Sequence, residues 1–203
     1  ELSPAVLIPR PETEALVAAA LDFLATRPDP SVLDIGAGSG AIALAIARNA
    51  RDARVTAVDI SADALAIARR NADRLGLRDR VELRRADCFD PLDGGEPLGR
   101  FDLIVSNPPY IRDGDIDLLG PEISRYEPRL ALDGGADGLD FYRRIAGEAP
   151  VHLAADAALM VEVGDGQSKA VMELLGGGGF ASTRAIPDLA GIPRVIVARL
   201  GPN

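Results

Sequence analysis

Cysteine, histidine, tryptophan and lysine are almost missing from this sequence of 203 residues. Cys88 is the only cysteine, which excludes an intrachain disulfide and a cysteine-rich zinc site, and we predict no metal site. His152 is the only histidine, and no pattern near it suggests a nucleophilic catalytic site. Because cysteine is so rare, the sequence predicts a protein of a reducing compartment, the cytoplasm.

The sequence also lacks an excess of positive charge and lacks long apolar runs. It has 22 lysines and arginines against 31 aspartates and glutamates, a net charge of −9. Nonspecific nucleic-acid binding depends on lysine and arginine contacts with phosphates, so we expect no stable binding of nucleic acid. The longest apolar runs, such as residues 41–47, are far shorter than the ~18 residues of a membrane helix, so none is predicted.

What the sequence does contain is an alternation of short apolar stretches with helical patterns, which is typical of a parallel α/β sheet. Strands are expected at residues 31–35, 54–60, 81–85, 101–106, 158–163, 180–186 and 194–200, and helices at 12–24, 41–49, 61–75, 139–149 and 167–175. Only residues 187–193 separate the last two strands, too few for a crossover helix, so these strands should pair antiparallel. The sequence therefore predicts about seven strands, mostly parallel, with an antiparallel last strand.

Two segments lie outside this alternation. Residues 1–30 are expected to form an irregular, proline-rich segment and a helix, ahead of one α/β domain over residues 31–203. Residues 111–138 form a polar stretch too long for an ordinary connection, so they are predicted to be either functional or disordered.

A glycine-rich turn follows the first strand and opens the next helix. Its sequence over residues 34–40 is DIGAGSG, so backbone amides at the start of the helix can face a ligand that approaches closely. Asp59 ends the second strand, 19 residues after Gly40, where a carboxylate can accept hydrogen bonds from both hydroxyls of a ribose. The residues predicted to bind this ligand are Gly36, Ala37, Gly38, Ser39, Gly40, Asp59 and Ile60.

Asp34, in the same turn, favours a positively charged ligand. A buried carboxylate is costly unless it is paired, and S-adenosylmethionine offers two cations, its ammonium and its sulfonium group. A dinucleotide instead offers a pyrophosphate, which this carboxylate would repel, although Ala41 can stand for the third glycine of a dinucleotide-binding turn. Asp87 and Cys88 follow the third strand at the same edge of the sheet, where Asp87 can accept the amino group of adenine. We therefore predict that Asp34, Asp87 and Cys88 also contact an adenosyl-sulfonium cofactor.

The sequence Asn107-Pro108-Pro109-Tyr110 ends the fourth strand. The two prolines fix the backbone and cannot continue a central strand, so a carbonyl is left free to accept from a ligand. The carbonyl of Pro108 and the side-chain oxygen of Asn107 can together bind a planar NH₂ group, while the ring of Tyr110 lies against its flat face. These acceptors would stabilise the positive charge that develops on an amide or aromatic amine nitrogen during methyl transfer. We predict that Asn107, Pro108 and Tyr110 are catalytic, that all four residues bind substrate, and that Asn107 also contacts the cofactor.

Four segments of the chain resemble a known family. They match HemK/PrmC-type methyltransferases, which modify the glutamine of the Gly-Gly-Gln motif in peptide-chain release factors, and they lie at residues 7–14, 32–42, 101–111 and 126–132. The resemblance covers nearly the whole chain. It implies the Rossmann-like fold of class I S-adenosylmethionine-dependent methyltransferases.

The resemblance also implies roles for particular residues. By this likeness Gly36, Gly38, Gly40 and Asp59 bind S-adenosylmethionine, the product is S-adenosylhomocysteine, and residues 107–110 bind the glutamine amide of a release factor. Relatives often have a large apolar or aromatic residue at the position of Cys88, so the contact of Cys88 with adenine is expected to be smaller. Members usually carry a helical domain ahead of the first matching segment, and this domain is expected to be absent here.

Three other functions stay open at this stage. Adenine-amino methyltransferases of DNA or RNA also place an Asn-Pro-Pro-aromatic sequence on a flipped base, although the net charge of −9 disfavours binding of a strand. A module that binds S-adenosylmethionine without methyl transfer would not need Asn107 and Tyr110. A nicotinamide oxidoreductase is compatible with the glycine turn alone. Glu162, at the end of the fifth predicted strand, is interpreted as structural.

Overall fold

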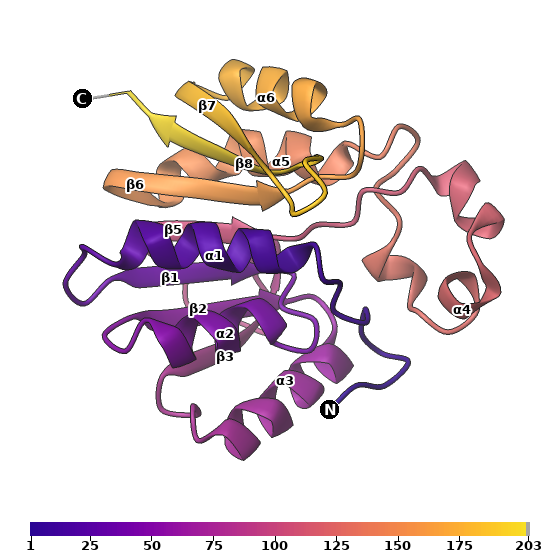
Figure 1. The fold of residues 1–203 in the computed structure, drawn as a ribbon. Helices are drawn as coiled ribbons and strands as arrows, with labels where there is room; N and C mark the ends of the chain where they lie inside the picture. Colours follow the sequence, from indigo (N-terminus) through magenta and orange to yellow (C-terminus); the bar gives the residue numbers. More distant parts are fainter. Residues whose placement is uncertain (202–203) are drawn as a thin grey trace.

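The computed structural model describes residues 1–201, which form one β-sheet with helices on both faces (Figure 1). The strands are β1 (Ser31–Ile35), β2 (Arg54–Asp59), β3 (Val81–Asp87), β4 (Asp90–Pro91), β5 (Phe101–Ser106), β6 (Leu153–Glu162), β7 (Phe180–Pro187) and β8 (Pro193–Leu200). Their order in the sheet is β4-β3-β2-β1-β5-β6-β8-β7. Neighbours pair parallel except at β4, which is antiparallel to β3, and at β8, which is antiparallel to both β6 and β7. The predicted α/β class and the antiparallel last strand are thus confirmed.

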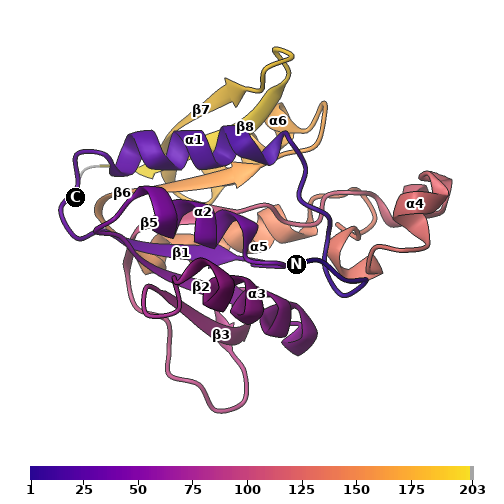
Figure 2. The same cartoon turned by 60° about the horizontal axis from the view of Figure 1, so that its bottom comes forward.

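The helices form two layers around this sheet. They are α1 (Thr13–Leu24), α2 (Ala41–Asn49), α3 (Ala62–Leu75), α4 (Pro121–Ser124), α5 (Asp140–Glu148) and α6 (Ser168–Gly177), with short 3₁₀ segments η1 (Asp113–Leu118), η2 (Arg129–Ala131) and η3 (Ala149–His152). Helices α1, α2 and α3 cover one face of the sheet, and α5 and α6 cover the other (Figure 2). Over residues 1–201, every helix is too short or too polar to cross a membrane.

Neighbouring residues of the central strands enter opposite layers of the core. In β1, Val32 packs with the α1 and α2 layer and Leu33 with the α5 and α6 layer. In β5, Leu103 and Ile104 divide in the same way, and all four side chains are fully buried. Burying one such side chain contributes roughly 1.5–3 kcal/mol. A sheet buried on both faces needs apolar residues at consecutive positions, which explains the apolar runs in the sequence.

The predicted strands agree with the observed ones within two residues, except for β4 and β6. Strand β4, which raises the number of strands to eight, was not predicted, because it is two residues long and ends in Pro91. Strand β6 begins at Leu153 rather than at residue 158. Its first half contains the exposed Ala155 and Asp156, where the register with β5 shifts and Asp156 has a φ of 58°, so the apolar pattern is interrupted there.

Residues 111–138 are folded, so of the two alternatives predicted for this segment, function or disorder, disorder was wrong. They contain η1, α4 and η2 and project from the edge of the sheet where the parallel strands end (Figures 1 and 2). The amide of Ile111 donates to the carbonyl of Leu132 at 3.0 Å, and the amide of Gly134 donates to the carbonyl of Ile111 at 2.8 Å. Ile116 and Leu132 are buried. These contacts place the segment beside the carboxyl ends of the central strands.

Candidate active site

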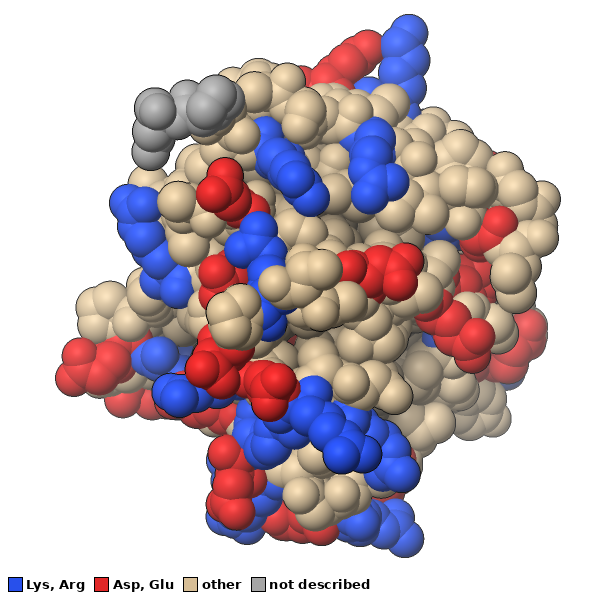
Figure 3. Space-filling view, turned by 60° about the vertical axis from the view of Figure 1, so that its left-hand side comes forward, with Lys and Arg blue, Asp and Glu red and all other residues tan. Residues whose placement is uncertain are grey.

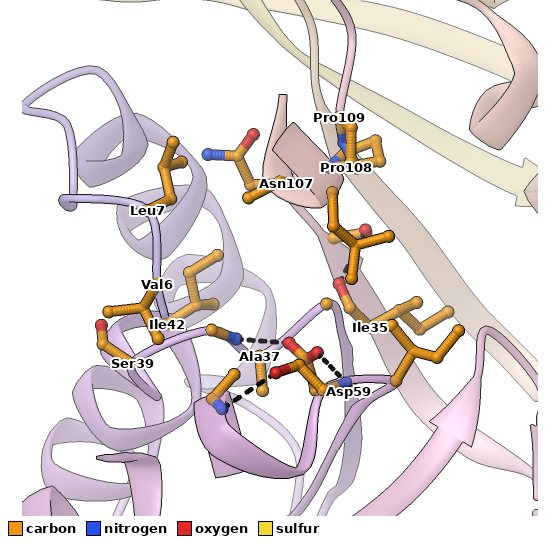
Figure 4. Close-up of a pocket in the computed structure, with 18 of the residues that line it drawn as sticks. Val6, Leu7, Ile35, Ala37, Ser39, Ile42, Asp59, Asn107, Pro108 and Pro109 are labelled. Atoms are coloured by element: carbon orange, nitrogen blue, oxygen red, sulfur yellow. Dashed lines mark hydrogen bonds between the residues drawn. The ribbon is translucent and has the colours of Figure 1, made fainter. Parts of the chain in front are cut away.

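A pocket opens at the carboxyl ends of β1, β2, β3 and β5. Asp59 lies at one end of it and Asn107 and Pro108 at the other, with Val6 and Leu7 along one side (Figure 4). The predicted site residues that line it are Gly36, Ala37, Gly38, Ser39, Asp59, Ile60, Asp87, Cys88, Asn107, Pro108 and Pro109. The other three predicted residues, Asp34, Gly40 and Tyr110, are not among the residues that line it. The structure therefore brings most of the two predicted groups together in one pocket.

The glycines of the turn between β1 and α2 have two different roles. Gly36 and Gly38 have φ values of 76° and 54°, which side chains disfavour, and a Cβ atom on either would meet nothing within 4 Å. They therefore keep the adjacent pocket open for a ligand. A Cβ atom on Gly40 would lie 3.1 Å from Leu44 and 3.2 Å from Ala68. Gly40 thus allows α2 and α3 to pack closely and stands behind the pocket.

Asp59 is held rigidly at the end of β2. Its Oδ2 atom accepts from the amide of Gly38 and its Oδ1 atom from the amide of Ser61, both at 2.8 Å. Burial raises the pKa of Asp59, and these backbone hydrogen bonds act in the opposite direction. Each oxygen retains acceptor capacity, so the carboxylate can receive two further donors, as the two hydroxyls of a ribose would supply. The amide of Gly38 is already used by Asp59, so it does not face a ligand freely as the sequence suggested.

Asp34 lies fully buried beneath the turn rather than in the pocket wall. Its Oδ2 atom accepts from the amide of Ala43 at 3.0 Å, and Oδ1 has no hydrogen-bond partner among residues 1–201. Burial, with a smaller contribution from the nearby charge of Asp59, raises the pKa of Asp34 to about 7, although the hydrogen bond from the amide of Ala43 acts to lower it. A direct contact of Asp34 with a bound cation stays a prediction, because in this structure the turn separates the carboxyl from the pocket.

The raised pKa of Asp34 makes the stability of the protein depend on pH. Its ordinary pKa of 3.8 applies in the unfolded chain and about 7 in the folded one, so the native state favours the protonated form. The contribution of protonated Asp34 to the free energy of unfolding is complete below about pH 4 and is lost as the pH rises through 7. The Asp34→Asn variant cannot ionise, so we expect its stability to increase relative to the wild type by about 2–4 kcal/mol between pH 4 and pH 8. Urea unfolding of both proteins across this range measures it, and a difference that does not change with pH would contradict it.

Asp87 and Cys88 line the pocket next to Arg144 of α5. The Nη1 atom of Arg144 donates to Oδ1 of Asp87 at 2.5 Å, and its Nη2 atom donates to Asp90 at 2.8 Å. Cys88 has a φ of 52°, and burial raises the pKa of its thiol to about 11, so the thiol stays neutral. Arg144 therefore fixes the loop that presents Asp87 and Cys88, and one oxygen of Asp87 is already engaged. A contact of Asp87 with an adenine amino group stays a prediction for the other oxygen.

Asn107 presents an oxygen acceptor beside the two prolines. Its Nδ2 atom donates to Oγ1 of Thr13 at 3.2 Å, which leaves Oδ1 as the available atom of the side chain. The ring of Tyr110 packs against Gly164, where an added Cβ atom would lie 2.9 Å from Cδ2 of the ring. The carbonyl of Tyr110 is also held, by Nε2 of Gln167 at 3.0 Å. Stacking of Tyr110 on a substrate amide therefore stays a prediction.

Two segments far apart in the sequence cover the pocket. Residues 5–9 contribute to its lining from the N-terminal side and residues 128–131 from the segment after β5. An ion pair joins the two, because Nη2 of Arg10 lies 2.6 Å and 2.8 Å from the two carboxylate oxygens of Glu127. The side chain of Glu127 is only 2% exposed. The predicted site residues did not include Arg10, Thr13 and Glu127. All three nevertheless lie in segments that resemble the methyltransferase family.

Replacing Arg10 by alanine is expected to loosen this cover. The change removes two charge-assisted hydrogen bonds and leaves the carboxylate of Glu127 buried without its cation, so we expect a loss of about 1.5–3 kcal/mol in the stability of the segment. Hydrogen exchange of residues 126–132 measures it. The Arg10→Ala, Glu127→Gln double variant is the control, because it removes the unpaired charge and should recover part of the loss. Unchanged exchange in Arg10→Ala would contradict the assigned role.

Comparisons with known proteins agree with this geometry. The sequence model of the Methyltransferase small domain family matches residues 14–122. A curated protein named release factor glutamine methyltransferase from Geobacter sulfurreducens is 48% identical over 98% of this chain and 68% of its own length. A protein of the same name from Gloeobacter violaceus is 46% identical over 97% of this chain and 68% of its own length. The chain thus spans about two thirds of the length of these relatives.

A solved structure shares both sequence and fold with the chain. It is the protein-(glutamine-N5) methyltransferase (release factor-specific) from Alicyclobacillus acidocaldarius, with a TM-score of 0.58 and 36% identity over 99% of each chain. Together with the order of the strands, this likeness identifies the predicted class I methyltransferase fold. The chain belongs to the family of release factor glutamine methyltransferases.

Proposed function

We propose that this protein transfers a methyl group from S-adenosylmethionine to the side-chain amide nitrogen of the glutamine in the Gly-Gly-Gln motif of peptide-chain release factors. The observation that carries the proposal is that one pocket contains both the rigid carboxylate of Asp59 and the acceptors of the Asn107-Pro108-Pro109 sequence. The first suits a ribose, and the second suits a planar NH₂ group. Membership of the family supplies the choice of a glutamine over other amides.

The residues at the Asp59 end of the pocket fit an adenosyl cofactor. Asp59 would hold the ribose, Gly36 and Gly38 leave room beside the backbone, and Cys88 offers a small neutral contact for the adenine. When bound, S-adenosylmethionine supplies an electrophilic methyl group on a positively charged sulfur. The buried carboxyl of Asp34, with its unpartnered Oδ1 atom, lies beneath the same turn and adds a negative charge when it ionises.

The residues at the other end act on the amide. Its nitrogen is a weak nucleophile because its lone pair is delocalised into the carbonyl. Oδ1 of Asn107 and the carbonyl of Pro108 would accept one N–H each, which stabilises the positive charge that develops on nitrogen and favours its pyramidal form. These contacts also hold the nitrogen in one orientation, and the covering segments joined by Arg10 and Glu127 limit the access of water.

Mass spectrometry of a release factor after incubation with this chain and S-adenosylmethionine tests the proposal. We expect a mass increase of one methyl group on the peptide that contains Gly-Gly-Gln, located on the glutamine by fragmentation. A release factor with glutamate in place of that glutamine is the control and should stay unmodified. Absence of methylation on the intact factor would contradict the proposal.

The same experiment includes adenine-containing DNA and RNA as alternative substrates. Methylation of a nucleic acid without methylation of the factor would favour the adenine-amino methyltransferase instead. Figure 3 shows the face turned away from the pocket, where both basic and acidic side chains are exposed. The net charge of −9 disfavours binding of a nucleic-acid strand and supports the protein substrate.

A further inference from the structure

Glu162 is a buried carboxylate beside the site that the proposed mechanism does not use. It ends β6, and the pairing of Ser106 with Val161 in the parallel β5 and β6 ladder brings it next to Asn107. Glu162 is only 1% exposed, and its Oε2 atom has no hydrogen-bond partner among residues 1–201. A carboxylate buried this deeply is costly unless polar neighbours compensate for it, so those neighbours indicate what it does.

The polar side chains next to this carboxyl group are those of Thr13 and Asn107. Burial raises the pKa of Glu162, while hydrogen bonds from the side chains of Thr13 and Asn107 and the charge of Arg194 lower it. Arg194 is itself engaged elsewhere, since its Nε atom donates to Asp188 at 3.3 Å and its Nη1 atom donates to a backbone carbonyl at 3.2 Å. The contacts of Glu162 therefore point toward the substrate end of the pocket.

The direction of these hydrogen bonds fixes the orientation of the Asn107 amide. A carboxylate only accepts, and a hydroxyl has a single proton, so Thr13 can donate that proton to Glu162 and accept in return. The hydroxyl of Thr13 accepts from Nδ2 of Asn107 at 3.2 Å, and Thr13 is itself buried. An amide carries its NH₂ group and its oxygen on opposite sides. Holding Nδ2 on the Thr13 side therefore turns Oδ1 of Asn107 the other way.

We infer that Glu162 is a positioning residue for methyl transfer, which acts both directly and through Thr13 to hold the Asn107 amide with Oδ1 toward the substrate. The inference rests on the proposed function, in which Oδ1 accepts from the substrate amide. A flipped Asn107 would present its NH₂ group to the substrate NH₂ group and would place Oδ1 against a carboxylate. The carboxylate thus disfavours the unproductive orientation, whereas an apolar side chain would leave both orientations available.

Two variants remove this control without removing Asn107. Glu162→Met keeps a side chain of similar length without acceptors, and Thr13→Val keeps the shape of threonine without its hydroxyl. For each we expect kcat on a release factor to fall about 10- to 100-fold, with cofactor affinity and KM within a few-fold. Thr13→Ser restores the hydroxyl and is expected to recover most of the turnover that Thr13→Val loses. The control is Tyr142→Phe, which removes a 2.9 Å hydrogen bond to the backbone carbonyl of Glu162 and leaves its carboxyl group intact.

A double variant separates positioning from general stability. If Glu162 acts only through Asn107, Asn107→Ala combined with Glu162→Met should be no slower than Asn107→Ala alone. If the fall in kcat of the double variant equalled the product of the falls in the two single variants, the inference would be overturned. Wild-type turnover in both Glu162→Met and Thr13→Val would overturn it as well. Where Glu162→Met does not fold, the comparison of Thr13→Val with Thr13→Ser decides.

Nuclear magnetic resonance of the protein without ligands gives a readout that does not depend on methylation. The side-chain NH₂ signal of Asn107 is identified as the one lost in Asn107→Ala. We expect it to shift in Thr13→Val and Glu162→Met but not in Tyr142→Phe, and an unchanged signal in both of the former would overturn the inference. If the wild type methylates no release factor, the proposed function fails, and this comparison still decides whether Glu162 orients Asn107.

Discussion

Asn107→Ala is expected to lower turnover on a release factor by about 10²–10³-fold, the usual effect of removing one preorganised polar contact with developing charge. The variant loses the Oδ1 acceptor of the side chain. In the wild type, Nδ2 of Asn107 donates to Oγ1 of Thr13 at 3.2 Å, which leaves Oδ1 free to accept from a substrate. Cofactor affinity should stay within a few-fold, because Asp59, which is proposed to bind the ribose of the cofactor, lies at the other end of the pocket. Steady-state kinetics with calorimetry of cofactor binding measures both quantities.

Asn49→Ala is the matched control for this prediction. Asn49 ends α2 on the surface and donates only to the carbonyl of Ala45, at 2.8 Å, so the same change of side chain occurs there without contact with the pocket. We expect its turnover to match the wild type. If Asn107→Ala also retained full turnover, the proposed role of Oδ1 in the transition state would be wrong. A parallel loss of cofactor affinity would instead place Asn107 mainly in the cofactor site.

The central part of the fold could be predicted because its determinants are local. Strand β1 and helix α2 begin and end where the apolar runs and the glycine turn indicated. Helix α3 ends at residue 75 as expected, where Gly76 follows with a φ of 67°. The antiparallel position of β8 followed from the short connection before it. In each case a few consecutive residues restrict the backbone strongly, so no knowledge of distant contacts was needed.

The parts that escaped prediction depend on contacts between distant residues. Residues 111–138 have little apolar periodicity, and they are ordered by backbone hydrogen bonds at Ile111 and by the ion pair between Arg10 and Glu127, which are 117 positions apart. Likewise, the sequence did not indicate that the ring of Tyr110 packs against Gly164, which is 54 positions away. Spacing along the chain identifies which residues reach the edge of the sheet, but not which way each side chain turns there.

Asp34 and Glu162 illustrate the same limit within the site itself. Both are acidic residues at the ends of central strands, and both are almost fully buried with one unpartnered oxygen among residues 1–201. The sequence assigned the first to the cofactor and the second to structure. The geometry places Asp34 beneath the turn, whereas Glu162, the residue interpreted as structural, lies beside Asn107.

Asp59→Ala is expected to weaken the binding of S-adenosylmethionine by roughly 1.5–3 kcal/mol, a factor of about 10 to 150 in Kd. The variant loses the acceptors for the ribose and also leaves the amides of Gly38 and Ser61 without the partner that each has at 2.8 Å. Calorimetry measures the affinity, and Asp63→Ala, the same change at an exposed position in the first turn of α3, should bind as the wild type does.

Titration of the wild type separates S-adenosylmethionine from a nicotinamide dinucleotide as the ligand. Both ligands present a ribose to an acid at the end of the second strand, so the substitution alone does not distinguish them. The wild type is therefore titrated with both, and we expect affinity for S-adenosylmethionine and none for the dinucleotide, whose pyrophosphate the buried carboxyl of Asp34 disfavours once it ionises above a pH of about 7. Equal affinity of Asp59→Ala and the wild type for S-adenosylmethionine would remove Asp59 from the site. In that case Asp59 would only stabilise the turn between β1 and α2, by accepting from the amide of Gly38, and would not contact the ligand.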